Sequence, residues 1–218
     1  FAAATLGGRE LWRDSVPANL RGATADAGFA ALDGQLRAQL TRLSADKRLI
    51  AVEIGVSGYI ASDRATVGQS ESPEWQNFPL SAKVTATLEA LGMSGVHVGI
   101  TNVSQLAALH AVRRELHLEP DTIAAYLGGR RSIGSALIVG GEIFRGAGGG
   151  AGDFGHLNVD PSGPSCPCGR NGCLQSLIGP QNLLTVGDLM PADAAARLVD
   201  ERPDEAIRLI VAAIDEGQ

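Results

Sequence analysis

Three cysteines and one histidine lie close together in the sequence, and residues of these types could bind a metal ion. The cysteines are Cys166, Cys168 and Cys173, which are all the cysteines of the chain, and His156 precedes them. Four soft donors in so short a stretch favour a tetrahedral zinc site. Four protein ligands leave no open position for water, so we expect the zinc to be structural.

The residues around the cysteines bear on two alternatives, a disulfide and free thiols. Gly163, Gly169 and Gly172 permit the positive φ angles that a chain needs to turn sharply around one ion. A disulfide would leave one of the three cysteines unpaired, and the two cysteines of a C-x-C pair are poorly placed to bridge each other. The C-x-C spacing is tighter than the C-x₂₋₄-C of common zinc folds, but the donor set favours zinc.

The composition indicates a globular protein that does not bind DNA through this segment. The chain has 218 residues, of which 44% are hydrophobic, so it can bury a core as one domain or two lobes. Its net charge of −6 argues against a surface that grips DNA phosphates. No apolar run approaches the roughly 20 residues that cross a bilayer, and the start FAAATL lacks the charged region of a signal peptide. We therefore expect a cytoplasmic protein, where thiols stay reduced.

The first part of the chain has the pattern of an α/β protein. FAAATL and RELWRDS flank Gly7 and Gly8 and predict a β-hairpin. Apolar residues at helical spacing over 25–47 predict an amphipathic helix. The continuous β-rich run at 49–58, bounded by charges and glycines, predicts a strand that is covered on both faces in a parallel sheet.

Residues 59–80 are polar and contain prolines, which predicts a loop with Trp75 as its packing anchor, or alternatively as a residue that stacks on a ligand. A helix is expected from about Ser81, with the serine as its cap, to Leu91, with Gly92 ending it.

Asn102 stands at a position where α/β proteins hold ligands. The strand VHVGI leads to it, and a helix is expected over 103–116. Ligands of open α/β sheets gather at the carboxyl ends of strands, so Asn102 could contact a small molecule. The alternative is that its side chain caps the following helix.

The second part of the chain predicts another sheet and two late helices. TIAAYL and SALIVGG have the pattern of strands, with EIFRG extending the second strand across a hairpin. Segments 191–201 and 203–217 each begin with proline and an acidic residue, as helices prefer. We expect two α/β lobes, 1–101 and 102–218, with a zinc loop over 156–173 in the second.

The motif CPCGRNGCLQ, with GDFGH upstream, resembles the signature of the ROK family (repressors, open reading frames and sugar kinases), whose usual pattern is G-E-x-G-H followed by C-x-C-G-x-x-G-C-L-E. Supporting segments are IGVSG at 54–58, PEWQNFPL at 73–80, VGITN at 98–102 and GSALIVGGEIFRGAGGGAGDFGH at 134–156. The resemblance implies a two-lobed sugar kinase fold of the actin-like, ribonuclease-H-like type. It also implies a strand with a D-x-G-x-T phosphate loop before the first hairpin and an adenine-contacting segment after the last helix, so we expect the fold to be incomplete at both ends.

The resemblance also implies which residues would meet the hydroxyls of a sugar. They are Asn102, Asp153 and Gln175, the last two in place of glutamates, together with His156. Carboxylates and amides suit polyols because each can bond two hydroxyls in a fixed geometry. His156 either binds zinc through one ring nitrogen and faces the sugar with the other, or is only a structural ligand.

The chain departs from the pattern of the kinases at the residues that would carry catalysis. ROK kinases have an aspartate after the asparagine, which serves as general base toward a sugar hydroxyl, and here Val103 follows Asn102. Ala111 stands where the family's helix has a glutamate, and the phosphate loop G-x-G-I-G is replaced by the residues 130–134, RRSIG. Side chains at Arg130 and Ser132 would hinder the approach of backbone amides to phosphates, although an arginine could itself pair with a phosphate.

Taken with these departures, the resemblance predicts a sugar-sensing effector domain of a ROK-type transcriptional regulator without kinase activity. It would bind a sugar or sugar phosphate, while operator DNA would be bound by an N-terminal winged helix-turn-helix that is not in this chain, in a homodimer or a dimer of dimers. The alternative is a ROK kinase that phosphorylates a hexose with ATP and uses Asp153 as its base. A third possibility is a zinc-stabilised binding protein with neither activity.

Overall fold

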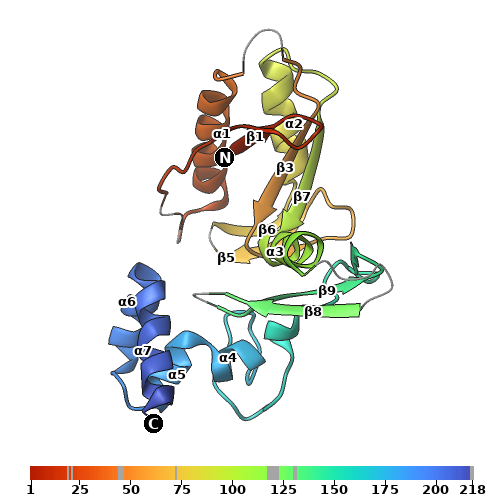
Figure 1. Cartoon of the computed structure of the whole chain (residues 1–218). Coiled ribbons are helices and arrows are strands. Elements are labelled where there is room, and N and C mark those ends of the chain that lie inside the picture. Colours follow the sequence, from red (N-terminus) through yellow and green to blue (C-terminus); the bar gives the residue numbers. More distant parts are fainter. Residues whose placement is uncertain are drawn as a thin grey trace. The chain divides into compact units, whose positions relative to one another are not determined.

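The computed structural model of the chain describes residues 1–18, 20, 22–43, 47–71, 73–116, 123–129 and 132–216. The chain divides into two compact units, Phe1–Val103 and Ser104–Gln218. Figure 1 labels many of their helices and strands. Among the described residues, none of the helices combines the length and the apolarity that crossing a membrane requires.

The first unit contains two two-stranded sheets. Strands β1 (Ala2–Ala4) and β2 (Glu10–Arg13) pair antiparallel, which confirms the predicted hairpin. Strands β3 (Ala51–Val56) and β7 (His97–Asn102) pair in parallel, with Val56 opposite Asn102. The prediction that the strand at 49–58 is covered on both faces is wrong, because alternate residues of β3 are exposed to solvent.

A three-stranded antiparallel sheet replaces the loop that was expected over 59–80. Its strands β4 (Tyr59–Ile60), β5 (Val67–Glu71) and β6 (Glu74–Phe78) are arranged in this order. The strands are short and most of their residues are polar, so the apolar residues are too few to mark the sheet in the sequence. Trp75 is a packing residue, as expected: its ring stacks on Phe78 with centroids 4.8 Å apart, and its Nε1 donates to the carbonyl of Ala25.

Helices α1 (Ala25–Leu40) and α2 (Leu80–Ala90) complete the first unit. Helix α1 ends at Leu40 rather than near 47, and residues 44–46 lie outside the described part of the chain. The expected serine cap of α2 is wrong, because Pro79 is the N-cap residue and the hydroxyl of Ser81 donates to the carbonyl of Val98 at 2.9 Å. The core beneath these helices contains the fully buried side chains of Val67, Leu80, Val84, Leu88 and Ile100.

Helix α3 (Val103–His110) continues as a π-helix, η1 (Ala111–Glu115), in place of the single α-helix expected over 103–116. The sheet of the second unit has the strand order β10-β9-β8, all antiparallel, with β8 at Ile123–Gly128, β9 at Gly134–Val139 and β10 at Glu142–Ile143. Ala108 and Val112 belong to the same buried cluster as Ala136 and Ile138 of β9.

The rest of the second unit consists of short helices around a small apolar core. A 3₁₀ turn, η2 (Phe154–His156), precedes the cysteine loop, and α4 (Leu174–Ile178) follows it. Helices α5 (Pro180–Val186), α6 (Ala192–Glu201) and α7 (Pro203–Asp215) pack together around Leu184, Leu198 and Ile210. Both late helices expected from the sequence are confirmed.

Candidate metal centre

The four predicted ligands converge at one point of the second unit. The donor atoms of His156, Cys166, Cys168 and Cys173 all lie within 4.8 Å of one another. The sulfurs of Cys168 and Cys173 are 3.6 Å apart, and the sulfur of Cys166 is 3.5 Å from Nδ1 of His156. Donors at 2.0–2.3 Å from a tetrahedral zinc ion lie about 3.5 to 3.8 Å from one another. The cysteines are free thiols, so the four side chains have the arrangement of a site that could hold one metal ion.

Two glycines let the loop close around this point. Gly172 has φ 62°, and a Cβ atom there would lie 1.4 Å from the carbonyl oxygen of Asp160, so no other residue fits without a backbone shift. Gly169 has φ 88°. The expectation of a positive φ at Gly163 is wrong; a Cβ atom there would lie 3.0 Å from the Cα of Gly172, so a side chain would require only a small shift of the loop.

Backbone hydrogen bonds hold the ligands in position. The amide of Cys166 donates to the carbonyl of Arg170 at 2.7 Å, and the amide of Gly169 donates to the carbonyl of Cys166 at 2.9 Å. On the other side, His156 is carried by η2, which is fixed to β9 through Ser135. The buried hydroxyl of Ser135 accepts from the amides of Phe154 at 2.6 Å and Gly155 at 3.3 Å.

The three thiols differ in acidity because their surroundings differ. Desolvation opposes ionisation of Cys168, but the backbone amide and guanidinium of Arg170 outweigh it and lower the pKa of this thiol to about 7. For Cys166, desolvation is likewise outweighed, by hydrogen bonds from the amide of Cys168 and the side chains of Ser176 and Gln175, so its pKa is also lowered. Desolvation and the neighbouring thiols raise the pKa of Cys173 to about 11. A metal ion would have to displace a proton from Cys173.

Two side chains that the sequence did not mark as part of the metal site contact the ligands. Nη2 of Arg170 donates to the carbonyl of His156 at 2.9 Å, and the Cys168 sulfur beside the guanidinium raises the pKa of Arg170. Nε2 of Gln175 donates to the sulfur of Cys166 at 3.2 Å. The signal for Arg170 was its position between Gly169 and Cys173, where a cation can balance the charge of thiolates.

The structure brings three of the four predicted sugar contacts into the neighbourhood of the cysteines. Asp153 directly precedes η2, His156 ends it, and Gln175 lies in α4. Desolvation raises the pKa of the Asp153 carboxyl, against the opposing influence of His156 and Arg170. Asn102 belongs to the first unit, where it ends β7 and its Nδ2 donates to the carbonyl of Gly58 at 2.7 Å.

The positions that depart from the kinase pattern are only partly described. Val103 is the first residue of α3 and is 42% exposed, and Ala111 begins η1. Of the segment at 130–134, Arg130 and Arg131 lie outside the described residues, and β9 begins at Gly134.

The relatives that match part of this chain include a kinase and a repressor. An N-acetylmannosamine kinase from Vibrio cholerae is 32% identical over 126 residues, which are 58% of this chain and 42% of the relative. A xylose repressor from Caldicellulosiruptor bescii is 31% identical over 141 residues, which are 64% of this chain and 33% of the relative. The chain thus matches less than half of the length of these relatives.

Two solved structures have similar folds. A ROK family glucokinase from Streptomyces griseus, in complex with glucose and AMPPNP, has a TM-score of 0.68 and 25% identity, with 97% of this chain and 68% of that chain covered. A ROK family transcriptional regulator, a homologue of the E. coli MLC protein, has a TM-score of 0.67 and 21% identity, with 84% and 44% covered. These similarities show that the chain has the α/β fold of ROK sugar kinases.

The family model of the ROK family matches residues 31–198. This range includes β3, β7, the cysteine loop and α5, ends within α6, and is most of the chain. The protein therefore belongs to the ROK family.

Proposed function

We propose that this chain is the sugar-sensing effector domain of a ROK-type transcriptional regulator and that it does not phosphorylate its ligand. The observation that carries the proposal is Val103. It follows Asn102 at the carboxyl end of β7, the position of the general base in ROK kinases, and a valine side chain accepts no proton. The similarity to a xylose repressor supports the same assignment.

We propose that Asn102, Asp153, His156 and Gln175 contact the sugar or sugar phosphate. The chemistry of these side chains supports this, since they offer carboxylate, amide and imidazole groups, which bond to adjacent hydroxyls. With Nδ1 of His156 directed to the cysteines, its Nε2 is left for a hydroxyl. Gln175 already donates to Cys166, so in this proposal its carbonyl oxygen is the group that accepts from the ligand.

The metal ligands in this proposal are His156, Cys166, Cys168 and Cys173, and the ion is a structural zinc. The donor distances support a tetrahedral ion with four protein ligands. Such an ion supplies no open coordination position. Its contribution is to fix the orientation of His156 and of the loop before α4.

We further propose that the two units are the lobes of the domain, with the expected boundary between 101 and 102 moved to follow Val103, and that sugar favours their closed arrangement. A ligand shifts such an equilibrium only if it binds one state more tightly, which contacts from Asn102 on one lobe and Asp153 on the other would provide. In a homodimer or a dimer of dimers, closure would re-aim a DNA-binding segment that precedes this chain toward or away from its operator.

The second candidate function is an ATP-dependent sugar kinase, and the N-acetylmannosamine kinase at 32% identity favours it. In that case Asp153 would have to act as the base. Its raised pKa makes it a better proton acceptor than an ordinary aspartate, although it lies in a different unit from Asn102.

The two functions are separated by measuring ligand binding and ADP release together. The purified protein is titrated with glucose, xylose and N-acetylmannosamine and with their phosphates, with and without Mg-ATP, while the melting temperature and ADP are followed. A sensor gives a higher melting temperature with one of these ligands and no ADP. Steady ADP release with any sugar contradicts the proposal and makes the protein a kinase.

Substitutions at Val103 test the observation on which the proposal rests. Val103→Asp puts a carboxylate at the position of the base, and Val103→Asn is its uncharged control. If only the base is absent, Val103→Asp releases ADP with the sugar that stabilises the protein, while Val103→Asn does not. ADP release by the unsubstituted protein that is lost in Asp153→Asn would identify the alternative base and overturn the proposal.

A further inference from the structure

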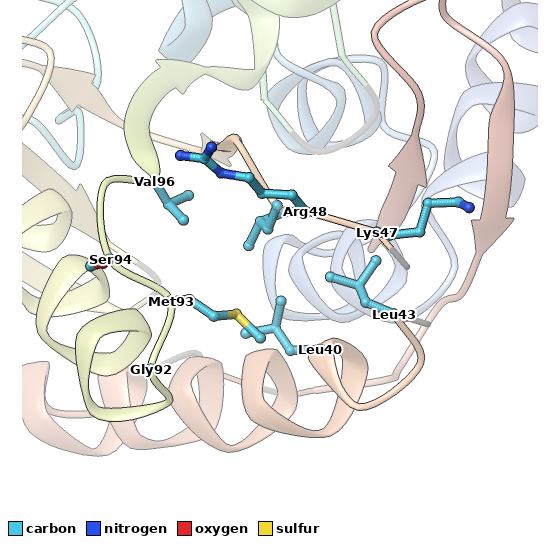
Figure 2. A pocket seen from close by; sticks show the side chains of 9 residues that line it. Leu40, Leu43, Lys47, Arg48, Gly92, Met93, Ser94 and Val96 are labelled. Carbon is cyan, nitrogen blue, oxygen red and sulfur yellow. The ribbon is translucent and has the colours of Figure 1, made fainter. Parts of the chain in front are cut away.

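The first unit contains a hollow that the proposed sugar and metal sites do not use. It has a volume of about 480 Å³, which lies within the roughly 300–1,000 Å³ of sites for small molecules. Its walls come from the end of α1, from the turn after α2 and from the residues just before β3 and β7 (Figure 2).

The floor of the hollow is apolar and well positioned. It consists of aliphatic side chains and one thioether, from Leu40, Leu43, Leu49, Met93 and Val96. A helix C-cap fixes the wall after α2: Gly92, with φ 77°, donates to the carbonyl of Glu89, and the amide of Met93 donates to the carbonyl of Leu88 at 2.8 Å. The hollow is thus built by regular structure, and its floor is the edge of the core.

Among the described residues that line the hollow, the charged ones are both basic, Lys47 and Arg48. Figure 2 shows the side chain of Arg48 extending toward Val96 and the ammonium of Lys47 pointing away from the hollow. Within the described part of the chain, the guanidinium of Arg48 takes part in no hydrogen bond or ion pair. Although the chain has a net charge of −6, this guanidinium is not paired with an acidic side chain of the described residues. It is therefore available to an anionic ligand beside the apolar floor.

The hollow lies at the opposite end of the sheet from Asn102. Leu49 and Val96 precede β3 and β7, whereas Asn102 ends β7, so the six residues of that strand, about 20 Å of chain, separate the two positions. A ligand in the hollow cannot be the sugar that Asn102 would contact.

We propose that this hollow binds a small amphipathic anion, with a carboxylate on Arg48 and a short hydrocarbon body on the apolar floor. A guanidinium pairs with a carboxylate through two parallel hydrogen bonds, and the floor provides apolar surface for burial. The C-terminal ends of α1 and α2 border the hollow and their dipoles oppose an anion. Because the dipoles do not favour an anion, the preference for one must come from the two parallel hydrogen bonds that Arg48 can donate to a carboxylate.

The two methionines of the sequence provide a direct test with octanoate as the probe. Met93 lines the hollow, while Met190 packs in the helical core of the second unit and is an internal control. In protein labelled with ¹³C at the methionine methyls, octanoate shifts the Met93 signal saturably and leaves Met190 unchanged. Octanol binds more weakly, and octylamine more weakly still.

Substitution of the guanidinium completes the test. Arg48→Gln weakens octanoate binding by about tenfold and removes its advantage over octanol. Arg9→Gln, which removes the same charge from the hairpin of the first unit, leaves the affinity unchanged. The proposal is overturned if Met93 does not respond saturably, if octanol or octylamine binds as tightly as octanoate, or if both arginine variants lose the same affinity.

Discussion

The core of the first unit and the cysteine loop of the second are ordered by different forces. In the first unit, Leu80, Leu88 and Ile100 are almost completely buried among other apolar side chains. In the loop, the apolar side chains of Leu157 and Val159 are 55% and 48% exposed, and the buried side chains are those of Cys166 and Cys173. The loop has too little apolar burial to offset its conformational entropy, so its order depends on backbone hydrogen bonds and, in the proposed site, on four side chains that share one ion.

The largest effect expected from this difference is that of Cys168→Ser. The variant loses one of four ligands, so zinc content measured by mass spectrometry falls from about one ion per chain to well below one. Hydrogen exchange of the loop amides rises toward the unfolded rate. Ser162→Ala, in the same loop and exposed, keeps its metal.

Tryptophan fluorescence tests whether the effect of Cys168→Ser is confined to the second unit. Trp12 and Trp75 both belong to the first unit, so the unfolding transition seen by their fluorescence should be nearly the same in Cys168→Ser and in the unsubstituted protein. An unchanged zinc content rejects the assignment of the ligand. A large shift of the tryptophan transition would contradict the independence of the two regions.

Leu88→Ala should give the opposite pattern. Leu88 is 1% exposed in the core of the first unit, and its truncation costs about 2–5 kcal/mol through lost burial and the remaining cavity. The loss is read from the tryptophan transition in urea. Zinc content and the hydrogen exchange of the loop amides stay as in the unsubstituted protein. A chelator does not lower the midpoint of the tryptophan transition any further. Loss of zinc in this variant would show that the two regions fold together.

The same difference explains how much of the molecule could be predicted from the sequence. The cluster of three cysteines and His156 was identifiable because these residue types have few roles, and β3 and β7 because their segments are rich in β-branched residues. The sheet β4-β5-β6 was missed because its strands have two to five residues and few apolar positions. The sheet is stabilised by the burial of Val67, Trp75 and Phe78 in the core of the first unit. These three residues are too far apart in the sequence to form a strand pattern.

Single hydrogen bonds between distant elements could not be predicted. Ser81 has the type of a helix cap, yet its hydroxyl bonds to Val98 because β7 offers a carbonyl at that point. Ser135 gives no signal in the sequence, since a serine in a strand is usually a surface residue, and its role exists only where β9 meets η2. Gln175 resembled a sugar contact, and its bond to Cys166 depends on how α4 follows the loop.

The smallest expected effect is that of a substitution at Ser135, whose hydroxyl joins β9 to the turn η2 before the cysteine loop. Ser135→Ala leaves the amides of Phe154 and Gly155 without their acceptor, which costs about 1–3 kcal/mol in the second unit. Since η2 carries His156, zinc should still bind, but with an affinity lowered by about tenfold or more in a chelator competition.

Ser70→Ala is the matched control, because Ser70 is buried to the same degree in the first unit and its hydroxyl donates to the carbonyl of Ser57. It should shift only the tryptophan transition. If Ser135→Ala lowers stability and leaves the zinc affinity unchanged, the ligand cluster positions itself and β9 adds nothing to it. If it lowers both, the loop is held by its metal and by the neighbouring sheet together, and the contrast with the first unit is one of degree.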